Sequence, residues 1–327
     1  MDNRVTHTSQ AGTDQVGSTF HIAFCVDNHY FRSMGATITS VIANNPDTHF
    51  TFHVLAFDVT DQHRERLLEL EQRFNVRTRL HIVDPDSFSE LRHFIEHSYY
   101  SLSIFSRLII PALLRDEADK VLYLDADILC VGKLDELIAM DLDNEIAAVV
   151  PDAPVTTARR CAALGLKHGR YFNGGVLYMH VANWIANRTT EKTMEVLLSP
   201  AKDMRFNDQD ALNIVIGGSA RFIDGKYNYI YDLIHDLDRN IRTMRPVGDA
   251  VFLHFAGAVK PWADWSEHEA RALFTKYHAL SPWSDMPLDP APRNSREMRM
   301  QARFLTKRGE LLRALGWFVR YLRKRAR

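Results

Sequence analysis

The sequence predicts an α/β protein with a mostly parallel central sheet. Short apolar runs rich in β-forming residues alternate with segments of helical spacing through the first half of the chain. Such alternation is typical of a parallel sheet that helices cover on both faces. The chain has 327 residues, of which 46% are hydrophobic, so it can bury a substantial core.

The elements are expected in the following order. The strands of the first half are placed at 20–26, 51–57, 78–83, 121–124 and 147–150. The helices between them are placed at 34–43, 60–74 and 104–114. In the second half, Gly174 and Gly175 predict a turn that leads into a strand ending at Met179. Helices then follow from about 181 and over 208–216, and a last strand over 251–255.

The number of cysteines and the hydropathy of the chain indicate the cellular compartment in which we expect the protein. The three cysteines are odd in number and widely spaced, so neither a disulfide framework nor a zinc site is expected. A reducing cytosol suits such a chain. Residues 1–19 are polar and lack the apolar core of a signal peptide, so we expect a disordered leader there. No run approaches the ~20 apolar residues of a membrane span.

The most informative motif is the pair Asp125 and Asp127, which follows the expected strand at 121–124. Residues two apart on a strand project to the same side, so the two carboxylates should converge where the strand ends. Open α/β sheets bind ligands at that edge. Ions such as Mg²⁺ take one or two carboxylates together with substrate phosphates. The pair therefore predicts a site for a metal ion and a diphosphate.

Position separates this pair from the four other Asp-x-Asp copies in the chain. Only this pair follows an apolar strand and precedes further apolar residues, Ile128 and Leu129. Carboxylates in such a setting are costly to desolvate unless something compensates them. Neither Gly-x-Gly-x-x-Gly nor the P-loop pattern occurs. A metal is therefore favoured over a glycine loop as the group that holds phosphates.

Three further segments carry polar residues at the expected ends of elements. Asn173 stands before two glycines, where backbone can approach a ligand closely, although a tight turn explains the pattern equally well. Residues 208–210, Asp-Gln-Asp, open a helix, and simple capping is the alternative. His254 ends the last strand and is followed by Gly257 and Lys260. A core histidine is the alternative there.

The four motifs described above occur along the chain in an order that resembles that of family 8 retaining glycosyltransferases. Within that family, the chain is most similar to the bacterial lipopolysaccharide core glucosyl- and galactosyltransferases. The resemblance covers roughly residues 20–285, which we expect to form the catalytic domain. The segments that carry it are 38–41, Arg107, 123–127, 208–210 and the block from His254 to Trp262. No single segment is specific, but their combination is.

The resemblance implies a nucleotide-sugar-binding fold of the A type and one Mn²⁺ or Mg²⁺ ion. The implied metal ligands are Asp125, Asp127 and His254, a set that suits Mn²⁺. Lys260 and the backbone of Gly257 would hold the diphosphate. The residues implied to contact the uridine are Cys25, Asp27, Asn28 and His29. Related enzymes commonly carry asparagine at the position of His29. The other implied donor contacts are Arg107, Asp125, Ala126, Asp152, Asn173, Gly174 and Asp208.

The implied reaction transfers glucose or galactose from UDP to a sugar hydroxyl of the lipopolysaccharide core, with retention of configuration. Retention through a covalent intermediate requires a carboxylate nucleophile. The residue that matches the sugar-face position is Gln209, a poor nucleophile. Front-face substitution is therefore favoured, with the Gln209 carbonyl stabilising the transition state, and double displacement through Asp208 is the alternative.

Two other functions are alternatives to transfer. A nucleotidyltransferase would make the activated sugar, but its usual glycine-rich basic loop after the first strand is missing. A non-catalytic protein would only bind sugar nucleotides or glycans, but every metal position that the resemblance implies is filled. Glucose and galactose are equal alternatives as the transferred hexose.

The charge of the chain is divided unevenly. Residues 293–327 contain twelve Lys/Arg and two Glu, a net charge of +10, whereas the whole chain carries −1. Apolar residues recur there at helical spacing. We expect residues 286–327 to form a linker and a basic amphipathic helical tail that lies on an anionic membrane surface.

The expected location is the cytoplasm, peripheral on the inner face of the bacterial inner membrane. A tail helix packed on the body, or an oligomer contact, is the alternative to membrane binding. Nucleic acid is a third candidate partner for a basic tail, but the acidic body disfavours it.

Overall fold

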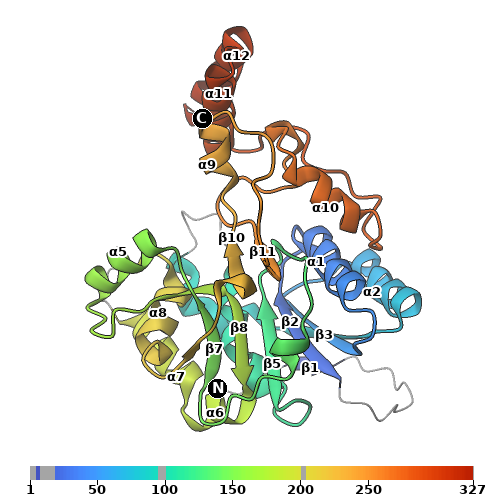
Figure 1. The fold of residues 1–327 in the computed structure, drawn as a ribbon, viewed down its shortest axis with the longest axis vertical. Coiled ribbons are helices and arrows are strands. Elements are labelled where there is room, and N and C mark those ends of the chain that lie inside the picture. Colours follow the sequence, from blue (N-terminus) through green and yellow to red (C-terminus); the bar gives the residue numbers. More distant parts are fainter. Residues whose placement is uncertain (1–4, 8–18, 95–100, 200–203, 327) are drawn as a thin grey trace.

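The structure, a computed structural model, describes residues 5–7, 19–94, 101–199 and 204–326. Its centre is an eight-stranded sheet with the strand order β1-β4-β3-β2-β5-β8-β7-β9 (Figure 1). The strands are β1 (Val5–His7), β2 (Phe20–Cys25), β3 (Phe50–Ala56), β4 (Arg77–Val83), β5 (Lys120–Leu124), β7 (Ala147–Pro151), β8 (Phe172–His180) and β9 (Arg221–Phe222).

The directions of the central strands determine which strand ends meet at the same edge of the sheet. β2 pairs in parallel with β3 and β5, and β3 pairs in parallel with β4. β8 runs antiparallel to both β5 and β7, with Leu124 opposite Val176. The start of β8 therefore lies beside the carboxyl end of β5. The predicted mostly parallel sheet is confirmed, with β8 as the main departure in its second half.

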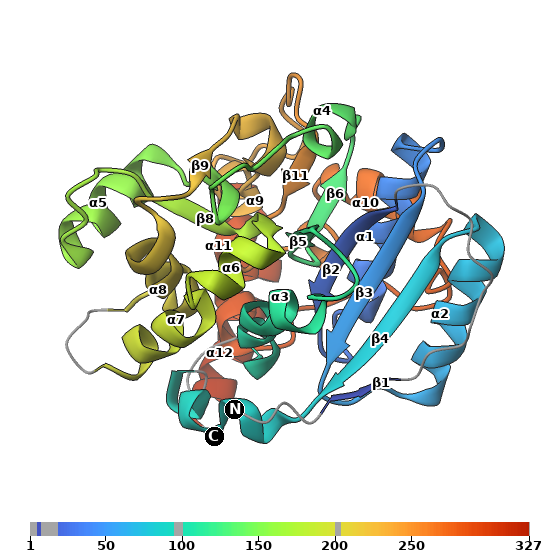
Figure 2. The same ribbon diagram turned by 90° about the horizontal axis from the view of Figure 1, so that it is seen from below.

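Helices cover both faces of this sheet (Figure 2). One face is covered by α1 (Phe31–Asn44) and α2 (Asp61–Phe74). The other face is covered by a 3₁₀ segment (Leu102–Ile109) and by the helices α3 (Ile110–Leu113), α6 (Val181–Ala186), α7 (Thr189–Leu198) and α8 (Asn207–Ile216). Strand side chains alternate between the faces. Ile22 and Phe24 pack with α1 and α2, whereas Ala23 packs on the other side.

A second, three-stranded sheet adjoins the first at the site. Its order is β10-β11-β6, formed by β10 (Tyr229–Ile230), β11 (Phe252–His254) and β6 (Ile128–Cys130). A short 3₁₀ turn, Gly225–Asn228, leads directly into β10. β6 starts one residue after Asp127, and its Ile128 pairs with His254. This pairing brings a late segment of the chain against the end of β5.

Several expectations need correction. Gly174 and Gly175 lie within β8, not in a turn that precedes it. The expected helix at 104–114 is mostly 3₁₀ and turns α-helical only at Ile110. Residues 5–7 of the expected disordered leader form β1, which pairs antiparallel with β4. The rest of that leader up to residue 18 lies outside the described residues. The short helices α4 (Asp135–Ile138) and α5 (Pro154–Leu164) were not expected.

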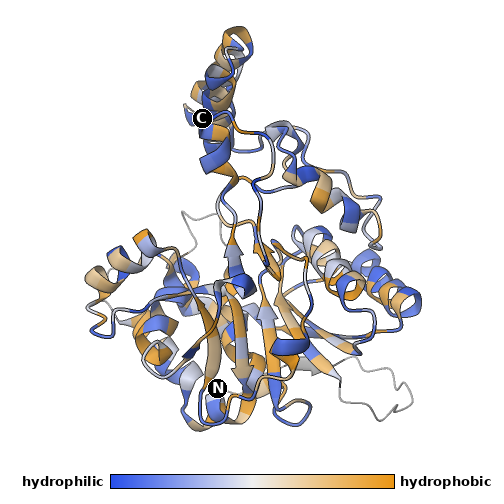
Figure 3. Ribbon diagram, in the orientation of Figure 1, coloured by the Kyte–Doolittle hydropathy of each residue, from blue (hydrophilic) through white to orange (hydrophobic). Residues whose placement is uncertain are grey.

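The C-terminal region is a pair of helices, α11 (Ser295–Lys307) and α12 (Leu311–Arg325), that projects away from the sheet (Figure 1). α11 buries Met300 and Phe304 against the cluster that includes Trp265 and Phe274, next to α9 (Leu233–Asp238) and α10 (Ala270–His278). α12 leaves most of its apolar residues exposed, and Figure 3 shows both helices as a mixture of hydrophilic and hydrophobic residues. Among the described residues, no helix has the length and apolar character needed to cross a membrane.

Three histidines form a hydrogen-bonded row across β2, β3 and β4. His21 Nδ1 lies 2.9 Å from His53 Nε2, and His53 Nδ1 lies 3.1 Å from His81 Nε2. His53 and His81 are buried. Burial lowers the pKa of His21. Burial, with the neighbouring positive charge of His81, His21 and Arg79, lowers the pKa of His53 well below its ordinary value of 6.5.

Acidification below pH 6.5 is therefore expected to destabilise the fold. The unfolded chain takes up protons there that His53 and His21 do not accept in the folded state, so the free energy of unfolding falls by up to about 1.4 kcal/mol per pH unit for each group. Their contribution is complete above pH 6.5. Urea unfolding between pH 8 and pH 5 measures it. His53→Gln should show a shallower loss, and an unchanged pH dependence would contradict this account.

Candidate active site at the carboxyl end of β5

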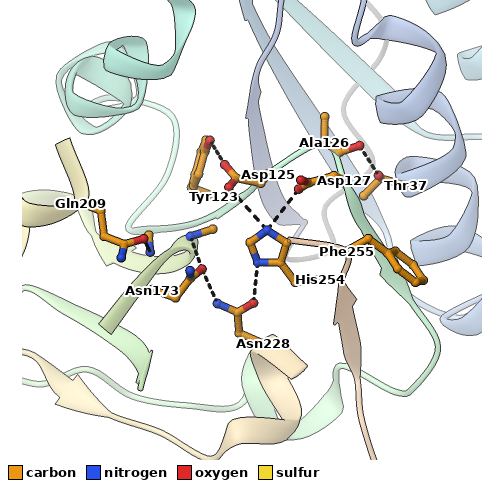
Figure 4. A network of polar contacts seen from close by, with 12 residues as sticks. Thr37, Tyr123, Asp125, Ala126, Asp127, Asn173, Gln209, Asn228, His254 and Phe255 are labelled. Carbon is orange, nitrogen blue, oxygen red and sulfur yellow. Dashed lines mark hydrogen bonds and ion pairs between the residues drawn. The ribbon is translucent and has the colours of Figure 1, made fainter. Parts of the chain in front are cut away.

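Asp125, Asp127 and His254 converge from two distant parts of the chain. The two aspartates follow β5, and His254 ends β11. One possible ligand atom from each residue lies within 4.8 Å of the other two. His254 Nε2 lies 3.2 Å from Asp127 Oδ1 and 3.9 Å from Asp125 Oδ2 (Figure 4). The structure thus brings the three predicted metal ligands together.

The donor set fits the predicted ion. Two carboxylates and one imidazole suit Mn²⁺, and they leave positions for substrate oxygens. Burial opposes the charge on Asp127, but Lys260 and His254 outweigh it and lower the Asp127 pKa. Burial likewise opposes protonation of His254, but Asp127 and Asp125 outweigh it and raise the His254 pKa. Asp127 is therefore ionised and available to a cation, and Lys260 Nζ ion-pairs with it.

The glycines of β8 allow a close approach to the imidazole. A Cβ atom built at Gly175 would lie 2.4 Å from His254 Cε1 and 2.8 Å from its Nδ1. Real side chains do not tolerate such distances, so only glycine lets the ring lie against β8. A Cβ at Gly174 would lie 3.3 Å from a guanidinium nitrogen of Arg107. Both glycines therefore serve packing at the site.

Arg107 holds the acidic side of the site together. Its buried guanidinium lies 3.3 Å from Asp125 Oδ1 and 3.0 Å from Asp208 Oδ2. It also donates a hydrogen bond of 2.7 Å to the Gly174 carbonyl and lies 4.5 Å from the centre of the Tyr123 ring. Burial raises the pKa of Asp208, although Arg107 opposes that rise. Asp208 is thus a buried carboxylate that is engaged by a cation.

Gln209 is held in one orientation. Its Oε1 accepts a hydrogen bond of 2.8 Å from the Gly174 N–H. Its Nε2 donates to Asp152 Oδ2 at 3.1 Å and to the Tyr171 hydroxyl at 3.0 Å. A carboxylate only accepts and a backbone N–H only donates, so these two partners fix which end of the amide faces which neighbour.

Asp210, the third residue of the Asp-Gln-Asp motif, has a structural role. Its side chain is fully buried. It accepts hydrogen bonds from Arg160 at 2.9 and 3.0 Å and from the backbone N–H groups of Arg205 and Phe206 at 2.7 and 2.8 Å. The Tyr171 hydroxyl donates to it as well. Asp210 therefore ties the start of α8 to neighbouring elements and so positions Asp208 and Gln209.

Two adjoining cavities surround this network. The larger cavity has a volume of about 560 Å³ and is lined by most of the predicted site residues. These are Arg107, Asp125, Asp127, Asp152, Asn173, Gly174, Asp208, Gln209, His254, Gly257 and Lys260. The smaller, about 330 Å³, is lined by His29, Tyr30 and Trp262 among others. Gly257 and Lys260 line both cavities, so they lie at the junction.

Four predicted donor contacts, Cys25, Asp27, Asn28 and Ala126, do not line either cavity. Asp27 Oδ1 instead accepts a 2.9 Å hydrogen bond from the backbone N–H of His29, so it shapes the loop before α1. Burial raises the pKa of the Cys25 thiol, which is therefore neutral. The structure does not bring these four residues onto the cavity walls.

Sequence reasoning missed other residues at the site. Asn228 contacts His254, and Tyr171 contacts Gln209. Arg205 and Arg296 line the larger cavity, and Arg296 belongs to α11, so the C-terminal region reaches the site. Asn228 lies in a short 3₁₀ turn with no periodic signal. In the sequence, Arg296 is one of many basic residues of the tail, with no local pattern that singles it out.

Comparison with known proteins agrees with this geometry. The model for glycosyl transferase family 8 matches residues 21–266, and the model for the family 8 C-terminal region matches residues 261–325. A lipopolysaccharide 1,2-glucosyltransferase of Escherichia coli is 31% identical over 84% of this chain and 82% of its own length. A lipopolysaccharide 1,3-galactosyltransferase of Salmonella typhimurium is 31% identical over 94% of this chain and 91% of its own length.

Solved structures show the same fold. An active-site mutant of LgtC matches with a TM-score of 0.67 and 25% identity, over 80% of this chain and 96% of that chain. The galactosyltransferase LgtC in complex with donor and acceptor sugar analogs matches with a TM-score of 0.66 and 24% identity, over the same shares. The expected A-type glycosyltransferase fold is confirmed. With family models that match almost the whole of the chain from residue 21 onward, this protein belongs to glycosyl transferase family 8.

Proposed function

We propose that the chain is a metal-dependent retaining hexosyltransferase that moves glucose or galactose from UDP to a sugar hydroxyl of the lipopolysaccharide core. The observation that carries this proposal is the meeting of Asp125, Asp127, His254 and Lys260 on the wall of a cavity of about 560 Å³. Family membership supports the reaction class. The names of the two relatives, which specify glucose and galactose transfer to lipopolysaccharide, support the substrates.

Asp125, Asp127 and His254 would hold Mn²⁺ or Mg²⁺. When bound, the ion would offset the negative charge that grows on the departing diphosphate. Lys260 would add a second positive charge to that end of the donor, because it lines both cavities beside Gly257. Such fixed charges stabilise the transition state because they need no reorganisation during the reaction.

Arg107, Asp152 and Asn173 would contact the hexose. All three line the larger cavity near Gln209, and Asp152 accepts hydrogen bonds from both Asn173 Nδ2 and Gln209 Nε2. A sugar hydroxyl that bonds Asp152 would therefore be placed relative to the Gln209 amide. Orienting the donor in this way lowers the entropic part of the barrier.

We favour front-face substitution over double displacement. Asp208 is paired with Arg107 at 3.0 Å, which weakens it as a nucleophile, and Gln209 is a neutral amide. The leaving diphosphate would accept the proton of the acceptor hydroxyl, and the Gln209 carbonyl would stabilise positive charge on the sugar. A covalent hexose trapped on Asp208 would overturn this preference.

A donor screen tests the proposal. UDP-glucose, UDP-galactose and UDP-N-acetylglucosamine are each incubated with enzyme and Mn²⁺, with and without dephosphorylated or intact core oligosaccharide, and UDP release is measured. We expect release from one of the first two donors, stimulation by the acceptor and loss of release in EDTA. Absence of metal-dependent release from every donor and acceptor pair would contradict the proposal.

We also propose that α12 places the enzyme on an anionic membrane surface at the cytoplasmic face of the inner membrane. Six large apolar residues of this helix are at least 37% exposed. They are Leu311, Leu312, Leu315, Phe318, Val319 and Leu322. The last turn contains Arg323, Lys324 and Arg325. Exposed apolar residues combined with basic ones suit the headgroup region of an anionic leaflet.

Deleting residues 311–327 is expected to move the enzyme from anionic vesicles to the soluble fraction. Each basic residue near such a surface contributes about 1 kcal/mol, and the apolar face adds to it. The deletion starts after α11 because Met300 and Phe304 belong to the core. Vesicle sedimentation measures the shift. Leu312→Glu should act in the same direction, whereas Leu280→Glu, at an exposed leucine on the body, should not. Equal sedimentation of the intact and truncated chains would reject the anchor.

A further inference from the structure

Asn228 joins the metal-ligand histidine to the sugar side of the cavity. It ends the 3₁₀ turn before β10 and is 3% exposed. Its Oδ1 lies 2.9 Å from His254 Nδ1, and its Nδ2 lies 2.9 Å from Asn173 Oδ1 (Figure 4). Asn228 therefore spans the space between β11 and β8.

The orientation of Asn173 follows from partners that can play only one role. Its Oδ1 lies 3.0 Å from the Gly175 N–H, which only donates. Its Nδ2 lies 3.3 Å from Asp152 Oδ2, and an ionised carboxylate only accepts. Both contacts require the same assignment of the amide. Asn173 Oδ1 is therefore an acceptor on the side that faces Asn228.

The orientation of Asn228 and the tautomer of His254 follow in turn. Since Asn173 Oδ1 accepts, the Asn228 group that meets it is the NH₂, and the Asn228 carbonyl faces His254. His254 Nδ1 must then carry the hydrogen that it donates to that carbonyl. In the neutral ring this leaves the lone pair on Nε2, which is the nitrogen that faces Asp125 and Asp127.

We propose that Asn228 is a positioning residue that fixes the tautomer and ring plane of His254 and so presents Nε2 to the metal. This inference rests on the proposed function, because it takes Asp125, Asp127 and His254 as metal ligands. A hydrogen bond to the far nitrogen of a ligating histidine commonly sets its tautomer and raises its basicity. Here the same amide also continues the network to Asn173, Asp152 and Gln209.

The surroundings give the ring little freedom to adopt another pose. Gly175 lies against one part of the imidazole, where a Cβ would clash. Backbone pairing also fixes both partners, because Ile230 of β10 pairs with His254 of β11 and Asn228 precedes β10 by one residue. The amide and the ring are thus carried by neighbouring strands of one sheet. Without the Asn228 carbonyl, the ring would lose the contact that distinguishes its two nitrogens.

Two substitutions at position 228 distinguish the hydrogen bond to His254 from the hydrogen bond to Asn173. Asn228→Leu removes both hydrogen bonds and is expected to raise the Mn²⁺ dissociation constant about 10- to 100-fold. Asn228→Asp keeps an acceptor for His254 Nδ1 but places an oxygen against Asn173 Oδ1. It should hold Mn²⁺ within a few-fold of the wild type, while the KM for the sugar nucleotide rises about tenfold. The Mn²⁺ affinity is measured by electron paramagnetic resonance on the full chain without donor.

A matched control separates positioning from folding. Asn45 is also a buried asparagine. Its side chain bonds backbone groups of Val41, Gly132 and Leu134 and the thiol of Cys130, and none of these residues lines either cavity. Asn45→Asp should lower the melting temperature and leave the Mn²⁺ affinity unchanged. Equal Mn²⁺ affinity of the wild type and Asn228→Leu would overturn the role of Asn228, as would equal weakening by Asn228→Leu and Asn228→Asp. Absence of Mn²⁺ binding in the wild type would instead overturn the metal site itself.

Discussion

Asp127→Ala is expected to lower the kcat of donor hydrolysis about 10³-fold or more. The carboxylate is one of three candidate ligands and is also the partner of Lys260. Its loss removes a ligand of the ion and leaves the ammonium of Lys260 and the imidazole of His254 without their shared anion. Losing one group that stabilises a growing anion commonly costs 10²- to 10³-fold in kcat, and here two such groups are disturbed together.

The assay is UDP release from the preferred UDP-hexose in saturating Mn²⁺. Asp143→Ala is the matched control, because Asp143 belongs to another Asp-x-Asp pair and is exposed, and it should retain wild-type rates. Asp125→Ala should resemble Asp127→Ala. A wild type that binds the donor without turnover, and loses binding on Asp127→Ala, would point to a non-catalytic binding protein. Full activity of Asp127→Ala would contradict the metal site.

Asp210→Ala is expected to destabilise the fold by about 3 to 5 kcal/mol. Removing one member of a buried ion pair is strongly destabilising because it takes away a partner that offsets the desolvation of the other charge, and Asp210 pairs with the buried Arg160 at 2.9 Å. The backbone N–H groups of Arg205 and Phe206 and the Tyr171 hydroxyl also lose their acceptor. Urea unfolding, followed by circular dichroism, measures the change.

An exposed ion pair supplies the control for this effect. Asp238 pairs with Arg303 at 2.7 Å, but both side chains are more than a third exposed, Asp238 at 34% and Arg303 at 46%. Asp238→Ala should cost no more than about 1 kcal/mol. Comparable losses for Asp210→Ala and Asp238→Ala would show that burial does not set the strength of the Asp210 network.

Elements with a strong local signal could be predicted closely. The helix expected at 60–74 is observed at Asp61–Phe74, because the Thr60 side chain caps it through the His63 N–H as the sequence indicates. The helix expected from Met34 begins earlier, at Phe31, since its N-cap, Tyr30, makes no side-chain capping bond that would mark the start. β9 and β10 have only two residues each, which is too short for any periodic pattern to identify.

The glycines before Val176 show why local rules fail at a site. Isolated from the fold, Gly174 and Gly175 are typical of a turn. In the structure they continue β8, and the space that their missing side chains leave is filled by His254 and Arg107. The need for glycine is therefore set by a ring that comes from β11, and no short-range pattern contains that information.

The sequence alone predicts those site residues that belong to a recognisable local motif. Asp125 and Asp127 could be identified as a candidate pair from the strand before them. His254 could be identified only through the resemblance to a family, because the sequence around it by itself favours a core histidine. Asn228 lies 26 residues from its partner His254 and in an irregular turn, so its contact depends on the pairing of β10 with β11.

A manganese anomalous difference map, from crystals grown with Mn²⁺ and UDP, tests the central claim most directly. We predict one strong peak at coordination distance from carboxylate oxygens of Asp125 and Asp127 and from Nε2 of His254, with diphosphate oxygens completing its ligands. Lys260 should lie beside the diphosphate. A peak that avoids these three side chains, or UDP bound in the cavity with no manganese beside it, would contradict the claim that this triad holds the metal and the donor.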